Sequence, residues 1–125
     1  MIFKLAFLLI LPATISSPLY CFHVPNNRQL SFHQCSESLA SQTYDKITEI
    51  YGFQPRRRSS NFFKCVDLNT TLVSPTGEET NYYFKGCIHK TFRVCDLRIS
   101  PKLYSSQNDK YCKICSTNYC NDYFK

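Results

Sequence analysis

The sequence predicts a small, disulfide-rich, mainly β domain with one inserted helix. Three observations favour this fold class. The chain has eight cysteines in 125 residues, and crosslinks commonly stabilise chains that bury only one small core. Residues 62–73 and 81–88 are rich in β-branched and aromatic side chains and flank a Pro/Gly turn, which is the pattern of a β-hairpin. Residues 37–51 instead repeat apolar side chains at helical spacing.

The first 17 residues have the pattern of a secretory signal peptide. One lysine precedes a short apolar run at residues 5–11, and the small residues Thr14 and Ser16 suit a cleavage site. A transmembrane anchor is the rival interpretation, but it needs about 20 apolar residues, and Pro12 ends this run early. We therefore expect a signal peptide at residues 1–17 that is removed on export.

Residues 18–125 are expected to form one domain that is released outside the cell. Residues 108–125 lack the hydrophobic tail of a GPI signal, so we expect neither a lipid anchor nor a transmembrane segment. Export exposes the chain to oxidising conditions, where an even number of cysteines in a short chain predicts disulfides. The formal net charge of +6 is ordinary for a secreted protein and favours acidic receptor faces, glycans or membrane surfaces as neighbours.

The residues between Cys21 and Cys35 predict a short hairpin. Apolar residues lie on either side of Pro25, Asn26 and Asn27, and an asparagine pair after proline is a turn signal. The two flanks are therefore expected to be short strands with cysteines at the base of the hairpin.

A helix is expected over about residues 37–51. Ser36 or Ser38 is a suitable N-cap, and Gly52 follows the last apolar position, where glycine commonly ends a helix. The apolar positions at helical spacing are Leu39, Thr43, Tyr44, Ile47, Ile50 and Tyr51.

An exposed loop is expected after the helix, where Pro55 precedes the three arginines Arg56, Arg57 and Arg58. This run is a candidate basic binding patch or a dibasic processing site. Short charge runs are more commonly solvated loop residues.

The clearest hairpin has strands at residues 62–73 and 81–88 and a turn at 74–78. Its first strand contains Asn69-Thr70-Thr71, which is an acceptor sequence for N-glycosylation. A glycan on Asn69 would exclude that face of the hairpin as a binding face.

The chain is expected to remain extended over residues 88–95. A third and weaker hairpin is expected beyond it, because the polar residues 105–109 separate Asp96–Tyr104 from Lys110–Ile114.

The cysteine pattern resembles the Ly6/uPAR superfamily, which includes the snake three-finger toxins. Thirteen residues separate Cys21 from Cys35, a second interval runs from Cys95 to Cys112, and the cysteines end with Cys115-Ser-Thr-Asn-Tyr-Cys120-Asn121. Cysteine spacing alone does not choose among the many pairings of eight cysteines, so the resemblance supplies the expected bridges.

Two further stretches carry the resemblance. Leu19 shortly before the first cysteine, with an aromatic residue after it, is similar to the superfamily's usual start. Tyr83-Phe-Lys-Gly-Cys87 resembles the insect quiver/sleepless-like branch, in which a hairpin ends in a basic residue, glycine and cysteine. The resemblance covers essentially the whole of residues 18–125.

The resemblance implies a three-finger fold: antiparallel hairpins on a four-disulfide hub, with the helix at about 37–51 as an insertion. The fingers would span residues 22–34, 66–86 and 96–111, and the side chain of Asn121 would bind backbone in the core. The implied disulfides are Cys21–Cys65, Cys35–Cys87, Cys95–Cys112 and Cys115–Cys120.

Three departures from the family pattern leave the binding surface open. Residues 36–64 replace a short link, two residues separate Cys112 from Cys115, and the extra first-finger bridge of many Ly6 proteins is absent. The inserted helix could therefore cover or replace the usual surface.

By this resemblance the protein is expected to act by non-catalytic binding, with no cofactor, metal or nucleic acid. The expected partner is an extracellular or membrane protein, such as a receptor, an ion channel or an adhesion partner. Rigid aromatic side chains and arginines are typical contact residues, although about half of the aromatics should alternate into the sheet. The candidates are Arg56, Arg57, Arg58, Tyr82, Tyr83, Phe84, Arg93, Arg98 and Tyr104.

Three alternatives remain open. A secreted ribonuclease would use two of His23, His33 and His89 for general acid and base chemistry, but the chain lacks the Cys-Lys-x-x-Asn-Thr-Phe signature of the pancreatic family. Zinc binding by Cys87, Cys95, Cys112 and Cys115 would require reduced thiols. A structural or secretory-fluid component is compatible with the same sequence features.

Overall fold

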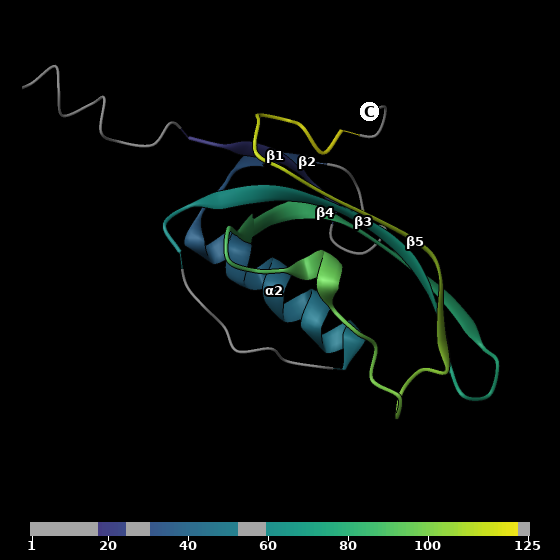
Figure 1. Ribbon diagram of the computed structural model, residues 1–125. Helices are drawn as coiled ribbons and strands as arrows, with labels where there is room; N and C mark the ends of the chain where they lie inside the picture. Colours follow the sequence, from purple (N-terminus) through teal and green to yellow (C-terminus); the bar gives the residue numbers. More distant parts are fainter. Residues whose placement is uncertain (1–17, 25–30, 53–59, 123–125) are drawn as a thin grey trace, which may run out of the picture.

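The computed structural model describes residues 18–24, 31–52 and 60–122 (Figure 1). They form a small, mainly antiparallel β fold with four disulfides and one α-helix. The elements are β1 (Tyr20–His23), β2 (Ser31–Gln34), α2 (Glu37–Tyr51), β3 (Phe63–Val73), β4 (Glu79–His89), the 3-10 helix η1 (Val94–Asp96) and β5 (Ser106–Cys115).

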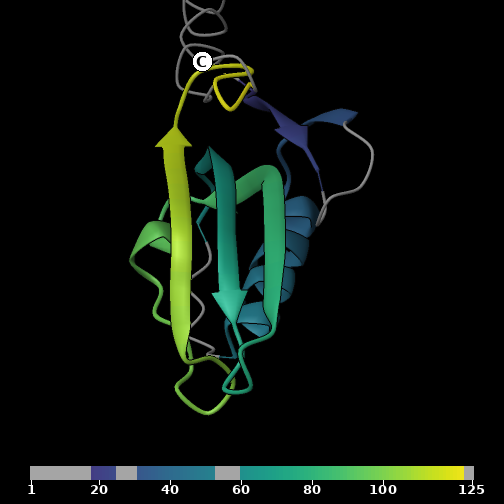
Figure 2. The same cartoon turned by 90° about the vertical axis from the view of Figure 1, so that its right-hand side faces the viewer.

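The long strands form one antiparallel sheet in the order β4-β3-β5 (Figure 2). The predicted β3–β4 hairpin is confirmed, with Cys65 opposite Cys87 at its base. Its turn is closed by the amide of Ser74, which donates to the carbonyl oxygen of Glu78 at 2.8 Å. Gly77 has a φ of 89°, a conformation that glycine adopts without steric cost.

β1 and β2 form a separate antiparallel pair, in which Cys21 lies opposite His33 and Phe22 lies opposite Phe32. The two strands of the predicted first hairpin are therefore confirmed. The turn expected at 25–27 lies outside the described residues.

The predicted helix is confirmed at Glu37–Tyr51. Ser36 is its N-cap, because its hydroxyl accepts a hydrogen bond from the amide of Leu39 at 3.2 Å. Gly52 ends the helix in the left-handed conformation, with a φ of 71°. The buried helical residues are Ala40, Thr43, Tyr44, Ile47, Thr48 and Tyr51.

The third predicted hairpin is wrong. The residues expected to form its turn, 105–109, lie almost entirely within β5, which pairs with β3 rather than with residues 96–104. A bulge accommodates the polar run, since the register shifts between Asn69 and Thr71, and Asp109 has a φ of 50°.

The extended conformation expected over residues 88–95 is also wrong. β4 ends at His89, and η1 follows at Val94. The connection then crosses the same side of the sheet as α2 (Figure 1), where the amide of Ser100 donates to the carbonyl oxygen of Tyr51 at 3.1 Å. Burial of apolar side chains against the helix favours this path over an isolated strand.

The core lies between the sheet and the layer made by α2 and the η1 connection. Alternate residues of β3 and β4 point into it, as the two-residue period of a strand requires. Its buried members are Tyr44, Ile47, Tyr51, Val66, Leu68, Phe84, Ile88, Phe92, Val94 and Leu97.

All eight cysteines are in disulfides, which join the pairs that the family resemblance implies: Cys21–Cys65, Cys35–Cys87, Cys95–Cys112 and Cys115–Cys120. Cys65 lies opposite both Cys87 and Cys115 in the sheet, so three of the bridges meet at one end. We call this end the hub. In the described part of the chain, no helix combines the length and the apolar composition needed to cross a membrane.

Asn121 fastens the C-terminal segment to the hub. Its side chain is fully buried, accepts a hydrogen bond from the amide of Phe22 at 3.0 Å, and donates to the carbonyl oxygens of Phe22 and Val66 at 2.9 Å each. It therefore connects β1, β3 and the chain end, as the resemblance implies for this residue.

Replacing Asn121 with alanine is expected to lower the free energy of unfolding by about 2–4 kcal/mol, because buried backbone groups of β1 and β3 lose their partner. Asn118→Ala is the matched control. Asn118 is exposed and accepts one bond, from the amide of Tyr20 at 2.9 Å, so its loss should cost less than about 1 kcal/mol. Denaturant unfolding of the oxidised proteins measures both, and equal losses would contradict this role for Asn121.

Candidate functional site

The described contact residues expected from the sequence do not form one surface, although the side chains of Tyr82 and Tyr104 interact. Arg56, Arg57 and Arg58 lie outside the described residues. Tyr82 and Tyr83 are neighbours on β4 and therefore point to opposite faces of the sheet. Tyr82 packs against the core, whereas Tyr83 faces away from it.

Phe84 of β4 is buried in the core. The remaining candidates lie in the connection between β4 and β5. Tyr104 is half-buried, and its hydroxyl donates to the carbonyl oxygen of Ile50. Burial, with a smaller contribution from Tyr82, raises the pKa of Tyr104 to about 12. Arg98 is exposed. Arg93 is also exposed and forms an ion pair with Asp96, three residues further along the chain. These residues form no common surface.

A different set of aromatic side chains meets on the outer face of the β1–β2 hairpin, at the hub. The ring centroid of Tyr119 lies 6.0 Å from that of Tyr20, 5.4 Å from Phe22 and 6.0 Å from Phe32. Phe32 is 63% exposed and Tyr119 is 38% exposed. We call these four residues the hairpin aromatic cluster.

Strand alternation and one tight turn assemble this cluster. Cys21 points inward on β1, so Tyr20 and Phe22 on either side of it point outward. Tyr119 has a φ of 58°, and its amide donates to the carbonyl oxygen of Tyr20 at 2.8 Å. The alternation around Cys21 was visible in the sequence, but the contact with Tyr119 depends on where the C-terminal segment folds back.

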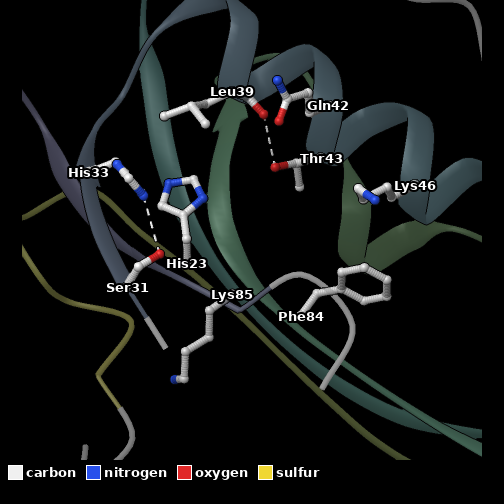
Figure 3. A pocket seen from close by; sticks show the side chains of 9 residues that line it. All are labelled: His23, Ser31, His33, Leu39, Gln42, Thr43, Lys46, Phe84 and Lys85. Atoms are coloured by element: carbon white, nitrogen blue, oxygen red, sulfur yellow. Dashed lines mark hydrogen bonds between the residues drawn. The ribbon is translucent and has the colours of Figure 1, made fainter. Parts of the chain in front are cut away.

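A pocket of about 180 Å³ lies between the β1–β2 hairpin, α2 and β4 (Figure 3). Polar and apolar side chains both line it, and Leu39 of α2 and Phe84 of β4 are its apolar members. The lining residues are His23, Ser31, His33, Leu39, Gln42, Thr43, Lys46, Phe84 and Lys85.

His23 and His33 bring two imidazoles together in this pocket, with ring centroids 5.2 Å apart in an edge arrangement. Nε2 of His33 is hydrogen-bonded to the hydroxyl of Ser31 at 3.2 Å. Nε2 of His23 lies 3.3 Å from Sγ of Cys87, so that nitrogen is engaged with a disulfide. Burial, with a smaller contribution from His33, lowers the pKa of His23 to about 4, which leaves the ring neutral at pH 7.

His89, the third histidine of the ribonuclease hypothesis, lies outside the pocket lining. Its Nε2 is 2.6 Å from a carboxylate oxygen of Glu37 in the first turn of α2, and its ring contacts Phe63 at a centroid distance of 5.8 Å. His89 therefore fastens the start of the helix to the end of β4.

The cysteines of the alternative zinc hypothesis are all oxidised. Cys87, Cys95, Cys112 and Cys115 each belong to a disulfide, whereas zinc is bound by thiolates. The sulfur atoms of Cys21, Cys35 and Cys87 lie within 4.8 Å of one another, but these too are disulfide sulfurs. Their proximity reflects two adjacent bridges.

The face of the sheet opposite α2 carries polar and aromatic side chains in rows. Asn69 of β3 lies in register with Tyr83 of β4 and Tyr111 of β5. Asn69 is exposed, and Oδ1 of its side chain accepts a hydrogen bond from Nδ2 of Asn81 at 2.9 Å. The glycosylation acceptor expected from the sequence is therefore at the surface.

No family model matches the chain, and no curated protein or solved structure matches it either.

The buried His23 is expected to make folding stability depend on pH. In the unfolded chain the histidine has a pKa near 6.5. In the folded protein burial lowers the pKa of His23 to about 4. The stability that neutral His23 contributes is therefore complete above pH 6.5 and is lost as the pH falls to 4, a loss of up to about 3 kcal/mol.

Denaturant unfolding at pH 7, 5.5 and 4 measures this loss. His23→Gln, which cannot bind the proton, should flatten the fall in stability over this range. His33→Gln, at an exposed position, should keep most of it. A fall of the same size in the wild type and in His23→Gln would show that other groups cause it.

Proposed function

We propose that this protein is a secreted, non-catalytic binding protein of three-finger type, and that its partner is an extracellular or cell-surface protein. Three structural features support the three-finger part of the proposal. A two-stranded pair accompanies a three-stranded sheet of order β4-β3-β5, the bridges pair first with third and second with fourth, and Asn121 binds backbone in the hub.

Secretion is supported by the disulfides and by the first 17 residues. Four disulfides with no free cysteine are typical of proteins that fold in an oxidising compartment. The N-terminal residues have the charged, apolar and small-residue regions of a signal peptide in the expected order.

The observation that carries the binding proposal is the hairpin aromatic cluster. Aromatic side chains are enriched at interface hot spots, because they bury a large area with few rotatable bonds. The cluster is fastened at its base by the Cys21–Cys65 bridge and by the bonds of Asn121 to Phe22. Phe32 and Tyr119 are thus exposed, and they rest on the half-buried rings of Tyr20 and Phe22. The net positive charge of the chain favours an acidic partner surface.

Phe32→Ser is expected to weaken saturable binding of the labelled mature protein to its target cells by about 30-fold, the effect of losing an aromatic hot spot. The melting temperature should change little, since Phe32 is 63% exposed. The measurement is a binding titration on intact cells, with and without protease treatment of their surface.

Phe62→Ser is the matched control, because Phe62 is 55% exposed and lies outside the cluster. Equal binding by the wild type and Phe32→Ser, or equal losses in both variants, would contradict a partner site at the hairpin aromatic cluster. Binding that survives protease treatment would contradict a protein partner.

A secreted ribonuclease is the second candidate, because His23 and His33 line one pocket together. The binding proposal expects the refolded mature protein to leave RNA intact over a range of pH. Robust cleavage that is lost in both His33→Ala and His23→Gln would replace the binding proposal with the enzymatic one.

A further inference from the structure

The face of the sheet that points away from α2 is built around Asn69. Asn69-Thr70-Thr71 is the one Asn-x-Ser/Thr sequence in the chain, and it lies in the middle of β3, the central strand. Thr70 points into the molecule and is fully buried, whereas Asn69 is exposed. The fold therefore presents the acceptor side chain to solvent.

The side chain of Asn69 is held in a defined orientation. Nδ2 of Asn81 donates to Oδ1 of Asn69 at 2.9 Å and to the hydroxyl of Thr71 at 3.2 Å. The first of these bonds uses the oxygen of the Asn69 carboxamide. It leaves Nδ2 of Asn69, the atom that carries an N-linked sugar, without a hydrogen-bond partner among the described residues.

Two tyrosines flank Asn69 on the neighbouring strands. Asn69 lies opposite Tyr83 on one side and opposite Tyr111 on the other, and directly opposed side chains begin about 5 Å apart across neighbouring strands. Tyr111 is 44% exposed. Pyranose rings place their apolar C–H groups on the electron-rich faces of aromatic rings, so the first sugar on Nδ2 lies within reach of both rings.

We propose that Asn69 carries an N-linked glycan whose first N-acetylglucosamine packs on Tyr111 and Tyr83, and that this sheet face is covered by the glycan. The inference rests on the proposed secretion, because only the secretory route supplies the donor. The donor is a lipid-linked oligosaccharide pyrophosphate: its C1–O bond breaks, a C1–N bond forms to Nδ2, the amide loses one proton, and the lipid pyrophosphate leaves.

A glycan on Asn69 would leave one of three surfaces of the protein open to a protein partner. α2 and the η1 connection cover one face of the sheet, and the glycan covers the other around Asn69. The hairpin aromatic cluster at the hub is left for a protein partner. Tyr83, a contact residue expected from the sequence, then acts on the attached sugar instead.

The first experiment expresses the full chain in cultured animal cells. Recovery from the medium, with a mass that falls on treatment with an N-glycosidase in the wild type but not in Asn69→Gln or Thr71→Ala, is the expected result. Secreted protein with no change in mass would overturn the glycan inference and leave the proposed secretion intact.

Failure of the chain to reach the medium would count against the proposed function. A second version of the chain, with an established signal peptide in place of residues 1–17, then tests Asn69 independently by the same change in mass. An unmodified Asn69 in that secreted protein would overturn the inference.

The second experiment tests the packing of the sugar. Loss of the glycan in Asn69→Gln is expected to lower the melting temperature by about 4 °C. When the protein also carries Tyr111→Leu, loss of the glycan should lower the melting temperature by less than half as much. Tyr119 lies in a different surface cluster, so in a protein that carries Tyr119→Leu the loss of the glycan should lower the melting temperature by the full amount.

Nuclear Overhauser contacts between the first sugar and the ring of Tyr111 provide a readout that does not depend on stability. Tyr111→Phe should preserve these contacts, because it keeps the ring. A glycosylated protein without them, and with equal melting differences in all backgrounds, would show a glycan that does not pack on the sheet.

Discussion

Two adjacent disulfides, Cys21–Cys65 and Cys35–Cys87, hold the β1–β2 hairpin against the β4-β3-β5 sheet. The hairpin and the sheet share little strand pairing. Sγ of Cys21 lies 3.3 Å from Sγ of Cys35, so the bridges from the β1–β2 hairpin to β3 and β4 are in contact. Within the described residues, one β-bridge, between Val24 and Lys85, pairs the hairpin with the sheet. Each disulfide contributes on the order of 2–4 kcal/mol. The helix begins immediately after Cys35, so the same bridges also fix where α2 meets β4, and the core depends on that placement.

The C-terminal segment closes the hub with polar contacts. Lys85 is buried, binds Asp67 at 2.9 Å, and donates a second bond to the backbone carbonyl of Asn121. A buried ion pair is costly unless its remaining hydrogen-bonding capacity is used, and the chain end supplies an acceptor. The side chain and the backbone of Asn121 are thus both engaged at the hub. This double attachment places Tyr119 on the outer face of the hairpin, which links the stability of the hub to the candidate binding surface.

Sequence reasoning succeeded where the signals are local. The helix could be predicted because its caps, Ser36 and Gly52, lie next to its apolar positions, and the β3–β4 hairpin because its turn is contained in five residues. The prediction of a third hairpin was wrong because β5 pairs with β3, which is more distant along the chain than residues 96–104. The polar run at 105–109 resembles a turn, but it contains a bulge at the left-handed Asp109. The disulfide pairing came from family resemblance and not from spacing. The hairpin aromatic cluster was missed because its members meet only after the C-terminal segment returns to β1.

Helix α2 limits where a partner can approach. Projecting hairpins with exposed sheet faces would offer partners a broad surface, but here α2 fills one face with Tyr44, Ile47 and Tyr51 as core residues. The hairpin aromatic cluster lies instead at the hub, where disulfides limit motion. Ordering side chains on binding costs about 0.5–1.5 kcal/mol each, and rings that already contact one another lose less freedom. Recognition through a crosslinked hub would therefore draw its affinity from preorganisation, whereas a partner gripping the distal turns would have to order them first.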